Sequence, residues 1–343
     1  MRYRPFANTG LFVSEICLGT MTFGAGSANP TWSAIGQLGA LDVQRMVGAA
    51  LDAGVNFIDT ADVYSGGQSE MLVGEALAAL GRPREGVIVA TKVRGRTGPG
   101  PNEIGLSRAH ILSAVDSSLR RLRLDYIDLY QIHGTDAATP IEETVRALDD
   151  LVRAGKVRYV GFSNLAAWQA MKALGYADAR GYARFVSAQV YYSLVGRDIE
   201  REIVPLAEDQ QLAILPWSPL AGGLLSGKYD PSGAGPEGAR RTQFDFPPVN
   251  PDRLAVVLPA LRKVSAETGV SVPRLALAWV LSKPFVTSVI IGAKSQAQFE
   301  DNVAAGDVRL SAEHLAELDA ASALAPEYPG WMMAWQGRGR RPE

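Results

Sequence analysis

The sequence predicts an α/β protein whose eight parallel strands close into a (β/α)8 TIM barrel. Short apolar runs bounded by turns alternate with helical stretches along the chain. The alternation repeats eight times, which favours a closed barrel over an open sheet. The chain has 343 residues, 47% of them hydrophobic, so it can bury a large hydrophobic core. We expect residues 1–343 to form a single domain.

The eight strand candidates are rich in β-branched and aromatic residues, as buried parallel strands should be. They are ICLGTMTF (16–23), VNFIDTAD (55–62), VIVATKV (87–93), YIDLYQIH (126–133), YVGFSN (159–164), VSAQVYY (186–192), AILPWSP (213–219) and TSVIIGA (287–293). The stretches between them have helical spacing, and several end at a glycine that suits a helix C-cap. Examples are residues 43–54, 69–81, 110–124, 141–156 and 199–211.

Parts of the chain before, within and after the strand–helix repeat are expected to add further segments to the barrel. Residues 2–15 contain an Asn-Thr-Gly turn between apolar runs, which predicts an N-terminal β-hairpin on the barrel floor. Residues 220–251, after the seventh strand, form a Gly- and Pro-rich connection of the length typical of a lid. Residues 311–324 predict an extra C-terminal helix. The apolar tail 327–343 should pack on the barrel mouth, on the barrel wall or on a second subunit.

Composition excludes several classes of function. The formal net charge is −2 without a long basic stripe, which argues against nucleic acid or an anionic membrane as a partner. No apolar stretch has the roughly twenty residues that a membrane span needs, so we expect a cytoplasmic protein. The single cysteine, Cys17, lies in an apolar run and is expected to be a core residue. No His or Cys cluster has metal-ligand spacing, so no metal site is predicted.

Four polar residues lie at or just after the ends of three consecutive strand candidates. They are Asp59, Tyr64, Lys92 and His133. In a parallel barrel the carboxyl ends of the strands meet at one mouth, so these side chains should converge there. Lys92 would lower the pKa of Tyr64 while Asp59 holds Lys92, so that Tyr64 could deliver a proton to a carbonyl oxygen. The pattern indicates an enzyme that acts on carbonyl groups.

Several motifs in consistent order resemble the aldo-keto reductase family over essentially the whole chain. They are DAGVNFIDTADVYSGGQSE (52–70), ATKV (90–93), DLYQIH (128–133), GKVRYVGFSN (155–164), WSPLAGGLLSGKY (217–229) and IIGAKSQAQFEDN (290–302). The long 220–251 connection is similar to that of the larger bacterial members and of the potassium-channel β-subunits. The resemblance implies a TIM barrel that uses NADPH without a dinucleotide fingerprint. Tyr64 is then the general acid, Lys92 tunes it, Asp59 pairs with Lys92, and His133 orients a small carbonyl substrate.

The same resemblance implies a set of cofactor-binding positions. Gly19, Thr20 and Met21 would contact the cofactor from the first strand, and Asp59 would also contact it. Ser163, Asn164 and Gln189 would hold the carboxamide. Either Tyr191 or Tyr192 would stack on the nicotinamide. The lid over the pyrophosphate would comprise Trp217, Ser218, Pro219, Leu220, Gly223, Leu225, Ser226, Lys228 and Arg240. The adenosine site would comprise Gly292, Lys294, Ser295, Gln298, Asp301 and Asn302. Lys294 and Ser295 would meet a 2'-phosphate, which favours NADPH over NADH without excluding NADH.

Two other functions are compatible with parts of the pattern. A lysine at a barrel mouth can form a Schiff base, so Lys92 could serve a lyase, although the cofactor motifs would then have no purpose. A regulatory subunit that binds NADPH with little turnover is also compatible. Met21, Phe23, Trp32, Trp331 and Trp335 are candidates for an apolar substrate pocket. The carbonyl substrate stays open among small aldehydes, sugar-derived carbonyls and bulky ketones, and the oligomeric state and direction of reaction stay open too.

Overall fold

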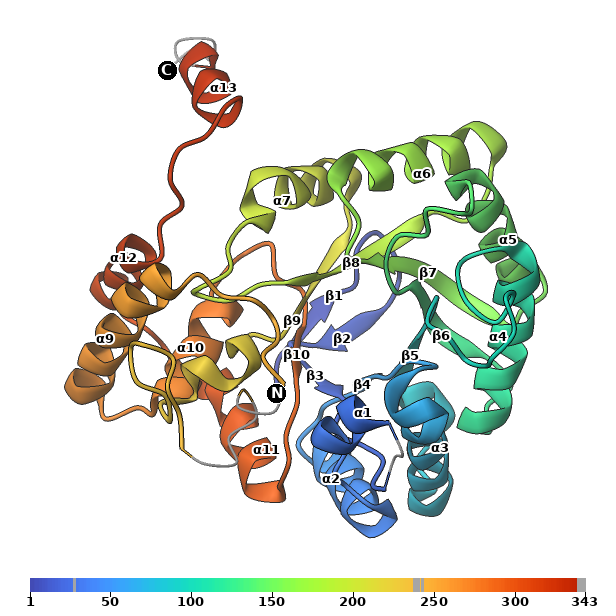
Figure 1. Ribbon diagram of the computed structural model, residues 1–343, viewed down its shortest axis with the longest axis horizontal. Helices are drawn as coiled ribbons and strands as arrows, with labels where there is room; N and C mark the ends of the chain where they lie inside the picture. The colour runs from blue at the N-terminus through green and yellow to red at the C-terminus, as the bar shows by residue number, and fades with distance from the viewer. Residues whose placement is uncertain (27–28, 237–240, 242–243, 338–343) are drawn as a thin grey trace.

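The structure is a computed structural model that describes residues 1–26, 29–236, 241 and 244–337 (Figure 1). Within these ranges eight parallel strands form one sheet in the order β10-β3-β4-β5-β6-β7-β8-β9. The strands are β3 (Ile16–Gly19), β4 (Phe57–Asp59), β5 (Ile88–Val93), β6 (Ile127–Ile132), β7 (Val157–Ser163), β8 (Phe185–Tyr191), β9 (Ala213–Trp217) and β10 (Val289–Ile291). Each lies inside or overlaps one of the eight predicted runs.

The sheet closes on itself at the seam between β9 and β10. Val286, just before β10, forms a parallel bridge with Ile214 of β9. The backbone N–H of Thr287 donates to the Ile214 carbonyl at 2.9 Å. On the other side of β10, Val289, Ile290 and Ile291 pair with the first barrel strand, β3. The predicted (β/α)8 barrel is therefore confirmed.

Helices follow the strands and cover the outside of the barrel, as Figure 1 shows. They are α2 (Ala40–Asp52), α3 (Gln68–Leu80), α4 (Arg108–Leu122), α5 (Ile141–Arg153), α6 (Ala167–Arg180), α7 (Ile199–Gln210), α9 (Pro251–Thr268), α10 (Val272–Leu281) and α11 (Gln296–Val303). The α5 helix illustrates the pattern, because Val145, Leu148 and Leu151 are buried against the sheet while Arg146 is exposed. Gly81 ends α3 with a φ of 59°, a left-handed conformation that suits glycine.

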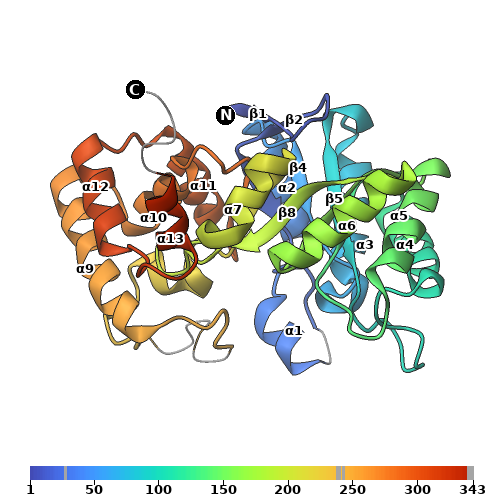
Figure 2. The same ribbon diagram turned by 90° about the horizontal axis from the view of Figure 1, so that it is seen from above.

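The predicted hairpin, β1 (Tyr3–Pro5) and β2 (Phe12–Ser14), covers the end of the barrel opposite α1 (Pro30–Ile35) (Figure 2). Phe6 follows β1 and packs edge-on against Phe57 inside the barrel, with 5.8 Å between ring centroids. Arg4 donates to the carbonyl oxygens of Leu281, Lys283 and Val286, which ties the hairpin to the last part of the barrel. The polar mouth is thus left open at the other end.

The connections contain elements that the sequence did not predict. Helix α1 lies between β3 and α2, and a 3-10 turn, η3 (Ala221–Ser226), begins the long connection after β9. The expected extra helix is α12 (Ala312–Ala321). The tail then forms a short helix, α13 (Gly330–Gln336), which stands away from the barrel in Figure 1.

The described part of the tail, residues 327–337, does not pack on the barrel mouth or wall, which were two of the expected sites. Trp331, Met333 and Trp335 of α13 are exposed. The linker before this helix is held on α7, because Arg201 forms an ion pair with Glu327 at 2.5 Å. Elsewhere in the described ranges, none of the helices combines the length and apolar character that a bilayer crossing requires. The single domain over residues 1–343 stays a prediction.

Candidate active site

The register of the sheet brings the predicted polar side chains to one end of the barrel. Asp59 is the last residue of β4, and Lys92 of β5 is paired with Gln131 of β6. Because alternate side chains of a strand point to opposite faces, Lys92 and Gln131 point together into the barrel. Tyr64 reaches the same place from a 3-10 turn, η1 (Tyr64–Gly67), and His133 directly follows β6.

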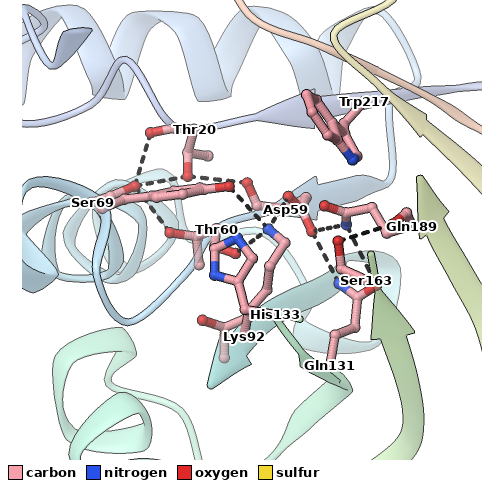
Figure 3. Close-up of polar contacts among 12 residues, drawn as sticks. Thr20, Asp59, Thr60, Ser69, Lys92, Gln131, His133, Ser163, Gln189 and Trp217 are labelled. Carbon is pink, nitrogen blue, oxygen red and sulfur yellow. Dashed lines mark hydrogen bonds and ion pairs between the residues drawn. The ribbon is translucent and has the colours of Figure 1, made fainter. Parts of the chain in front are cut away.

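Lys92 lies at the centre of the cluster in Figure 3 and is fully buried. Its Nζ donates to Asp59 Oδ2 at 2.5 Å, to the Thr60 carbonyl at 2.7 Å and to the Tyr64 hydroxyl at 3.3 Å. Three donor positions thus meet three oxygens, which is the full capacity of an ammonium group. The arrangement fixes the amine between the carboxylate and the phenol.

The second oxygen of Asp59 is held by two amides. Gln189 Nε2 donates to Asp59 Oδ1 at 2.8 Å, and Gln131 Nε2 donates to it at 3.2 Å. Hydrogen bonds to a buried carboxylate and an adjacent cation together offset the cost of taking its charge out of water. Gln131 was not among the predicted site residues, although its register opposite Lys92 places it there.

A group of hydroxyls supports this cluster. Ser69 Oγ lies 2.7 Å from Thr20 Oγ1 and 2.9 Å from Thr60 Oγ1 (Figure 3). Thr20 is fully buried, and its hydroxyl also donates to the Asp59 carbonyl at 3.1 Å. These bonds hold the strand ends of β3 and β4 together. Thr20 therefore positions Asp59, and its side chain is not open to the mouth.

Two aromatic rings flank the Tyr64 phenol. The His133 ring is edge-on to Tyr64 at a centroid distance of 5.8 Å. The Trp32 ring, from α1, lies at 5.7 Å. Trp32 was one of the candidate pocket residues, and the structure places it at the site. Trp331 and Trp335, two other candidates, lie on the exposed α13 instead, and Phe23 is buried in the core.

The environment changes the ionisation of three of the four residues. Burial alone would lower the pKa of Lys92, but Asp59 and Tyr64 raise it above its usual value. Burial, together with the positive charges of Lys92 and Arg94, lowers the pKa of His133 to about 3. His133 is therefore a neutral imidazole at neutral pH.

Burial affects the pKa of Tyr64 more than Lys92 does. Burial raises the pKa of the Tyr64 hydroxyl, and although Lys92 lowers it as predicted, its effect is smaller than that of burial. The carboxyl groups of Asp59 and Asp62 raise it further. Tyr64 is thus a phenol, not a phenolate, at neutral pH, as a proton donor must be.

The predicted carboxamide-binding residues form a connected group beside the cluster. Ser163 Oγ donates to the Gln189 carbonyl at 2.9 Å. Asn164 Nδ2 donates to Ser163 Oγ at 2.8 Å, and its Oδ1 accepts from Trp217 Nε1 at 3.0 Å. These are hydroxyl and amide groups that complement the donors and acceptors of a carboxamide. The residues present therefore fit a nicotinamide at this place.

Only one of the two tyrosines at the end of β8 can stack on a nicotinamide. The Tyr192 side chain is fully buried, stacks on Trp279 at 5.4 Å and donates to Glu200 at 2.5 Å. Tyr191 is half-buried, and its ring lies 5.1 Å from Trp217 at the end of β9. The structure therefore places Tyr191, and not Tyr192, at the mouth.

The predicted lid residues fall into different environments. Trp217 stacks on Phe246, with centroids 5.6 Å apart and an angle of 5° between the planes. Ser218 Oγ accepts from the Gly222 N–H at 2.9 Å, which fixes the start of η3. Leu225 is fully buried, whereas Lys228 is exposed. Pro219, Leu220, Gly223 and Ser226 lie in and before η3, and Arg240 lies outside the described residues.

The predicted adenosine site gathers around the start of α11. Ser295 is its N-cap, and the hydroxyl oxygen accepts from the Gln298 N–H at 3.3 Å. Gln298 Oε1 in turn accepts from the Lys294 N–H at 2.9 Å. Asn302 Nδ2 donates to the exposed Gly292 carbonyl at 3.3 Å. The predicted residues of this group are thus neighbours.

Arg274 is a residue of this region that the sequence did not indicate. Its Nε forms an ion pair with Asp301 at 2.7 Å, which joins α10 to α11. It lies in a helix that is distant in sequence from the α11 motif, so no local signal marked it.

The predicted first-strand contacts lie at the end of β3. An added Cβ at Gly19 would lie 2.7 Å from Ile290 Cγ2, so packing against β10 requires the glycine. Met21 follows and is half-buried.

A family model for the aldo/keto reductase family matches residues 15–323. The chain belongs to the aldo/keto reductase family. It is therefore an oxidoreductase with the barrel fold described above. The resemblance inferred from the motifs is confirmed, and the match covers every strand of the barrel.

Three relatives align with this aldo/keto reductase over nearly the full length of both chains. It is 38% identical over 327 residues to the uncharacterized oxidoreductase YrpG of Bacillus subtilis, covering 93% of this chain and 95% of that protein. It is 38% identical over 316 residues to a probable voltage-gated potassium channel subunit beta of Arabidopsis thaliana, covering 90% and 92% of the two chains. It is 33% identical over 357 residues to versiconal hemiacetal acetate reductase of Aspergillus parasiticus, covering 96% and 99%.

Proposed function

We propose that this chain is an NADPH-dependent reductase of aldehydes or ketones, with Tyr64 as the general acid. The observation that supports this most strongly is the position of Lys92. Its ammonium group contacts Asp59 at 2.5 Å and the Tyr64 hydroxyl at 3.3 Å in one buried site. A phenol that gives up its proton becomes negative, and an adjacent cation stabilises that charge.

Each of the four residues has a distinct task in this proposal. Tyr64 donates its proton to the carbonyl oxygen of the substrate, and Lys92 stabilises the phenolate that remains. Asp59 keeps Lys92 charged and in place. His133 is neutral, because its pKa is about 3, and so offers an N–H donor that orients the carbonyl without adding a charge. Trp32 narrows the space in which the substrate lies.

The cofactor would lie along the ends of β7, β8, β9 and β10. A nicotinamide bound there supplies the hydride that reduces the carbonyl carbon. Ser163, Asn164 and Gln189 would hold its carboxamide, and the Tyr191 ring would face its plane. Ser295 uses an acceptor position for the N-cap, which leaves its O–H free to donate to a phosphate oxygen. That donor and the Lys294 charge support a preference for NADPH.

The proposal is tested by titrating the purified protein with NADPH and NADH while tryptophan fluorescence is recorded. We expect saturable quenching, with tighter binding of NADPH. A Trp217→Phe variant is the matched control, because Trp217 is the tryptophan beside the proposed carboxamide site and its removal should reduce the signal. Loss of NADPH absorbance is then followed with a panel of aldehydes and ketones. Failure to bind either cofactor would reject the proposal.

The two alternative functions predict different experimental outcomes. A Schiff-base lyase needs an uncharged amine, but the raised pKa and three hydrogen bonds of Lys92 keep it an ammonium. Borohydride trapping of a carbonyl compound on Lys92 would nonetheless favour the lyase. Tight binding of NADPH without turnover across the panel would favour a regulatory subunit, in line with the name of the Arabidopsis relative.

A further inference from the structure

A pair of carboxyl groups, Asp62 and Glu70, lies behind the proposed active site, on the outer face of the barrel wall. Thr91 precedes Lys92 on β5 and is paired with Tyr130 of β6. Since successive side chains alternate, Thr91 and Tyr130 point away from the barrel interior, toward α3 and α4. Glu70, in the first turn of α3, is fully buried against them and accepts from the Thr91 hydroxyl at 2.5 Å. Asp62 joins this group from the segment that connects Asp59 to Tyr64.

The two carboxyl groups differ in their partners. Glu70 also accepts from Arg121 Nε of α4 at 2.6 Å, so its charge is paired. Asp62 is only 2% exposed, and among the residues that the structure describes none donates a hydrogen bond of ordinary geometry to its carboxylate oxygens. The Tyr130 hydroxyl is also buried and has no hydrogen-bond partner in the described part of the chain. A buried carboxylate with so little hydrogen bonding is costly to ionise, so such a group keeps its proton.

The electrostatic surroundings agree with this conclusion. Burial and the negative charge of Glu70 raise the pKa of Asp62 to about 8, and Arg121, Lys92 and the Val63 N–H lower it only in part. The titratable and charged groups that interact with Asp62 come from five neighbouring elements. They are Tyr64 (η1), Glu70 (α3), Lys92 (β5), Arg121 (α4) and Tyr130 (β6).

Asp62 is also joined to the active site through the backbone. Its N–H donates to the Lys92 carbonyl at 3.2 Å, and the Tyr64 N–H donates to the Ala61 carbonyl at 3.2 Å. These bonds tie the backbone around Asp62 to the strand that carries Lys92 and to the turn that carries Tyr64. The charge of Asp62 is felt at Tyr64, where it raises the pKa of the phenol.

We propose that Asp62 is a positioning residue that must carry a proton for Tyr64 to act as an acid, so that its ionisation switches off carbonyl reduction. This inference rests on the reductase function proposed above. When Asp62 is neutral, the Lys92 charge is shared between Asp59 and the phenol. When Asp62 loses its proton to solvent, a second negative charge opposes the phenolate that Tyr64 becomes after donation. Proton transfer to the substrate is then less favourable.

The protonated state is tested first, without cofactor or substrate. The infrared difference spectrum of the wild type minus Asp62→Asn should contain the carbonyl stretch of a protonated carboxyl group at about pH 6. We expect this band to disappear as the pH rises, with a midpoint near 8. The absence of the band at low pH would overturn the proposal. Because no reaction is measured, this result is independent of whether the protein is a reductase.

The effect on Tyr64 is tested by the pH dependence of kcat/KM for reduction, from about pH 6 to about pH 10. The wild type should lose activity tenfold per pH unit once Asp62 ionises. Asp62→Asn should move this fall to higher pH by at least about one unit, a tenfold difference at the alkaline end. Glu70→Gln should move it to lower pH, since the charge that raises the pKa of Asp62 is removed.

Opposite shifts in the two variants distinguish a charge effect from a structural one. Glu75→Gln is the matched control, because Glu75 is on the same helix, α3, and pairs with Arg123 away from the cluster. The alkaline fall of kcat/KM in this variant should coincide with that of the wild type. If Asp62→Asn does not fold, the Glu70→Gln shift carries the test. Coincident alkaline falls in all variants, or an upward shift in Glu70→Gln, would overturn the proposal.

Discussion

The unpartnered Asp62 carboxyl group should make the folded protein less stable as the pH rises. Asp62→Asn replaces it with a neutral group of nearly the same shape. The pKa of Asp62 is raised from 3.8 to about 8 in the folded state. An acid whose folded pKa is raised binds more protons folded than unfolded at intermediate pH, so the free energy of unfolding falls as the pH increases. The window runs from about pH 4 to about pH 8.

The size of the effect follows from the width of this window. Between pH 4 and pH 7 the wild type should lose roughly 1.4 kcal/mol of stability per pH unit through Asp62, or about 4 kcal/mol in total. The variant has no proton to lose at this position and should not show this loss. At acidic pH the two proteins should be similar, and at neutral pH the variant should be more stable.

Urea unfolding followed by circular dichroism at several pH values measures this difference. The quantity compared is the free energy of unfolding of the variant minus that of the wild type, as a function of pH. Asp125→Asn is the control, since Asp125 is exposed and its substitution removes one negative charge from the surface. A difference for Asp62→Asn that does not grow between acidic and neutral pH would refute the reasoning. It would mean that Asp62 has a partner that stabilises its charge.

Three other predictions follow from the structure. Tyr64→Phe should abolish carbonyl reduction and leave the NADPH affinity within a few-fold, because the phenol supplies a proton and not binding energy; full activity would remove Tyr64 as the acid. Lys294→Ala should weaken NADPH binding by about 1–3 kcal/mol more than NADH binding in parallel titrations, and an equal loss for both would place Lys294 away from the 2'-phosphate. Gly74→Ala should destabilise the protein by about 1–3 kcal/mol in thermal unfolding, because an added Cβ would lie 2.3 Å from the Leu122 carbonyl oxygen. Gly175→Ala, in an exposed helical position with no atom within 4 Å, should stabilise it by up to about 1 kcal/mol, and the same sign for both variants would contradict this packing argument.

The barrel could be predicted from the sequence because its signals are local and repeated. Each buried strand is a short apolar run, and polar residues such as Lys92 interrupt the pattern where the strand reaches the mouth. The convergence of Asp59, Lys92 and His133 then follows from parallel strands alone. Gln131 could have been found in the same way, since it lies two residues before His133, and residues two apart on a strand point to the same face.

The remaining features depend on geometry that no local pattern encodes. Asp59 and Asp62 are similar residues at the same strand end, and the backbone between β4 and η1 decides that one faces Lys92 and the other lies behind the wall. Trp32 lies in a Gly- and Ser-rich segment that gave no helical signal, yet α1 brings it against Tyr64. The net pKa of Tyr64 depends on how deeply the hydroxyl is buried, which only the folded chain determines.

The pairing of the first barrel strand with the last one has a consequence for how the protein is made. Ser288 Oγ donates to the Ser14 carbonyl across 274 residues of sequence, beside the β3–β10 pairing. At about 5–20 residues per second, a ribosome needs roughly 14 to 55 seconds to synthesise that length. During this time one edge of β3 is an unpaired strand edge, which is prone to associate with other chains. The nascent chain therefore keeps an open strand edge until the last barrel strand is made, and a chaperone that covers this edge would protect it in this interval.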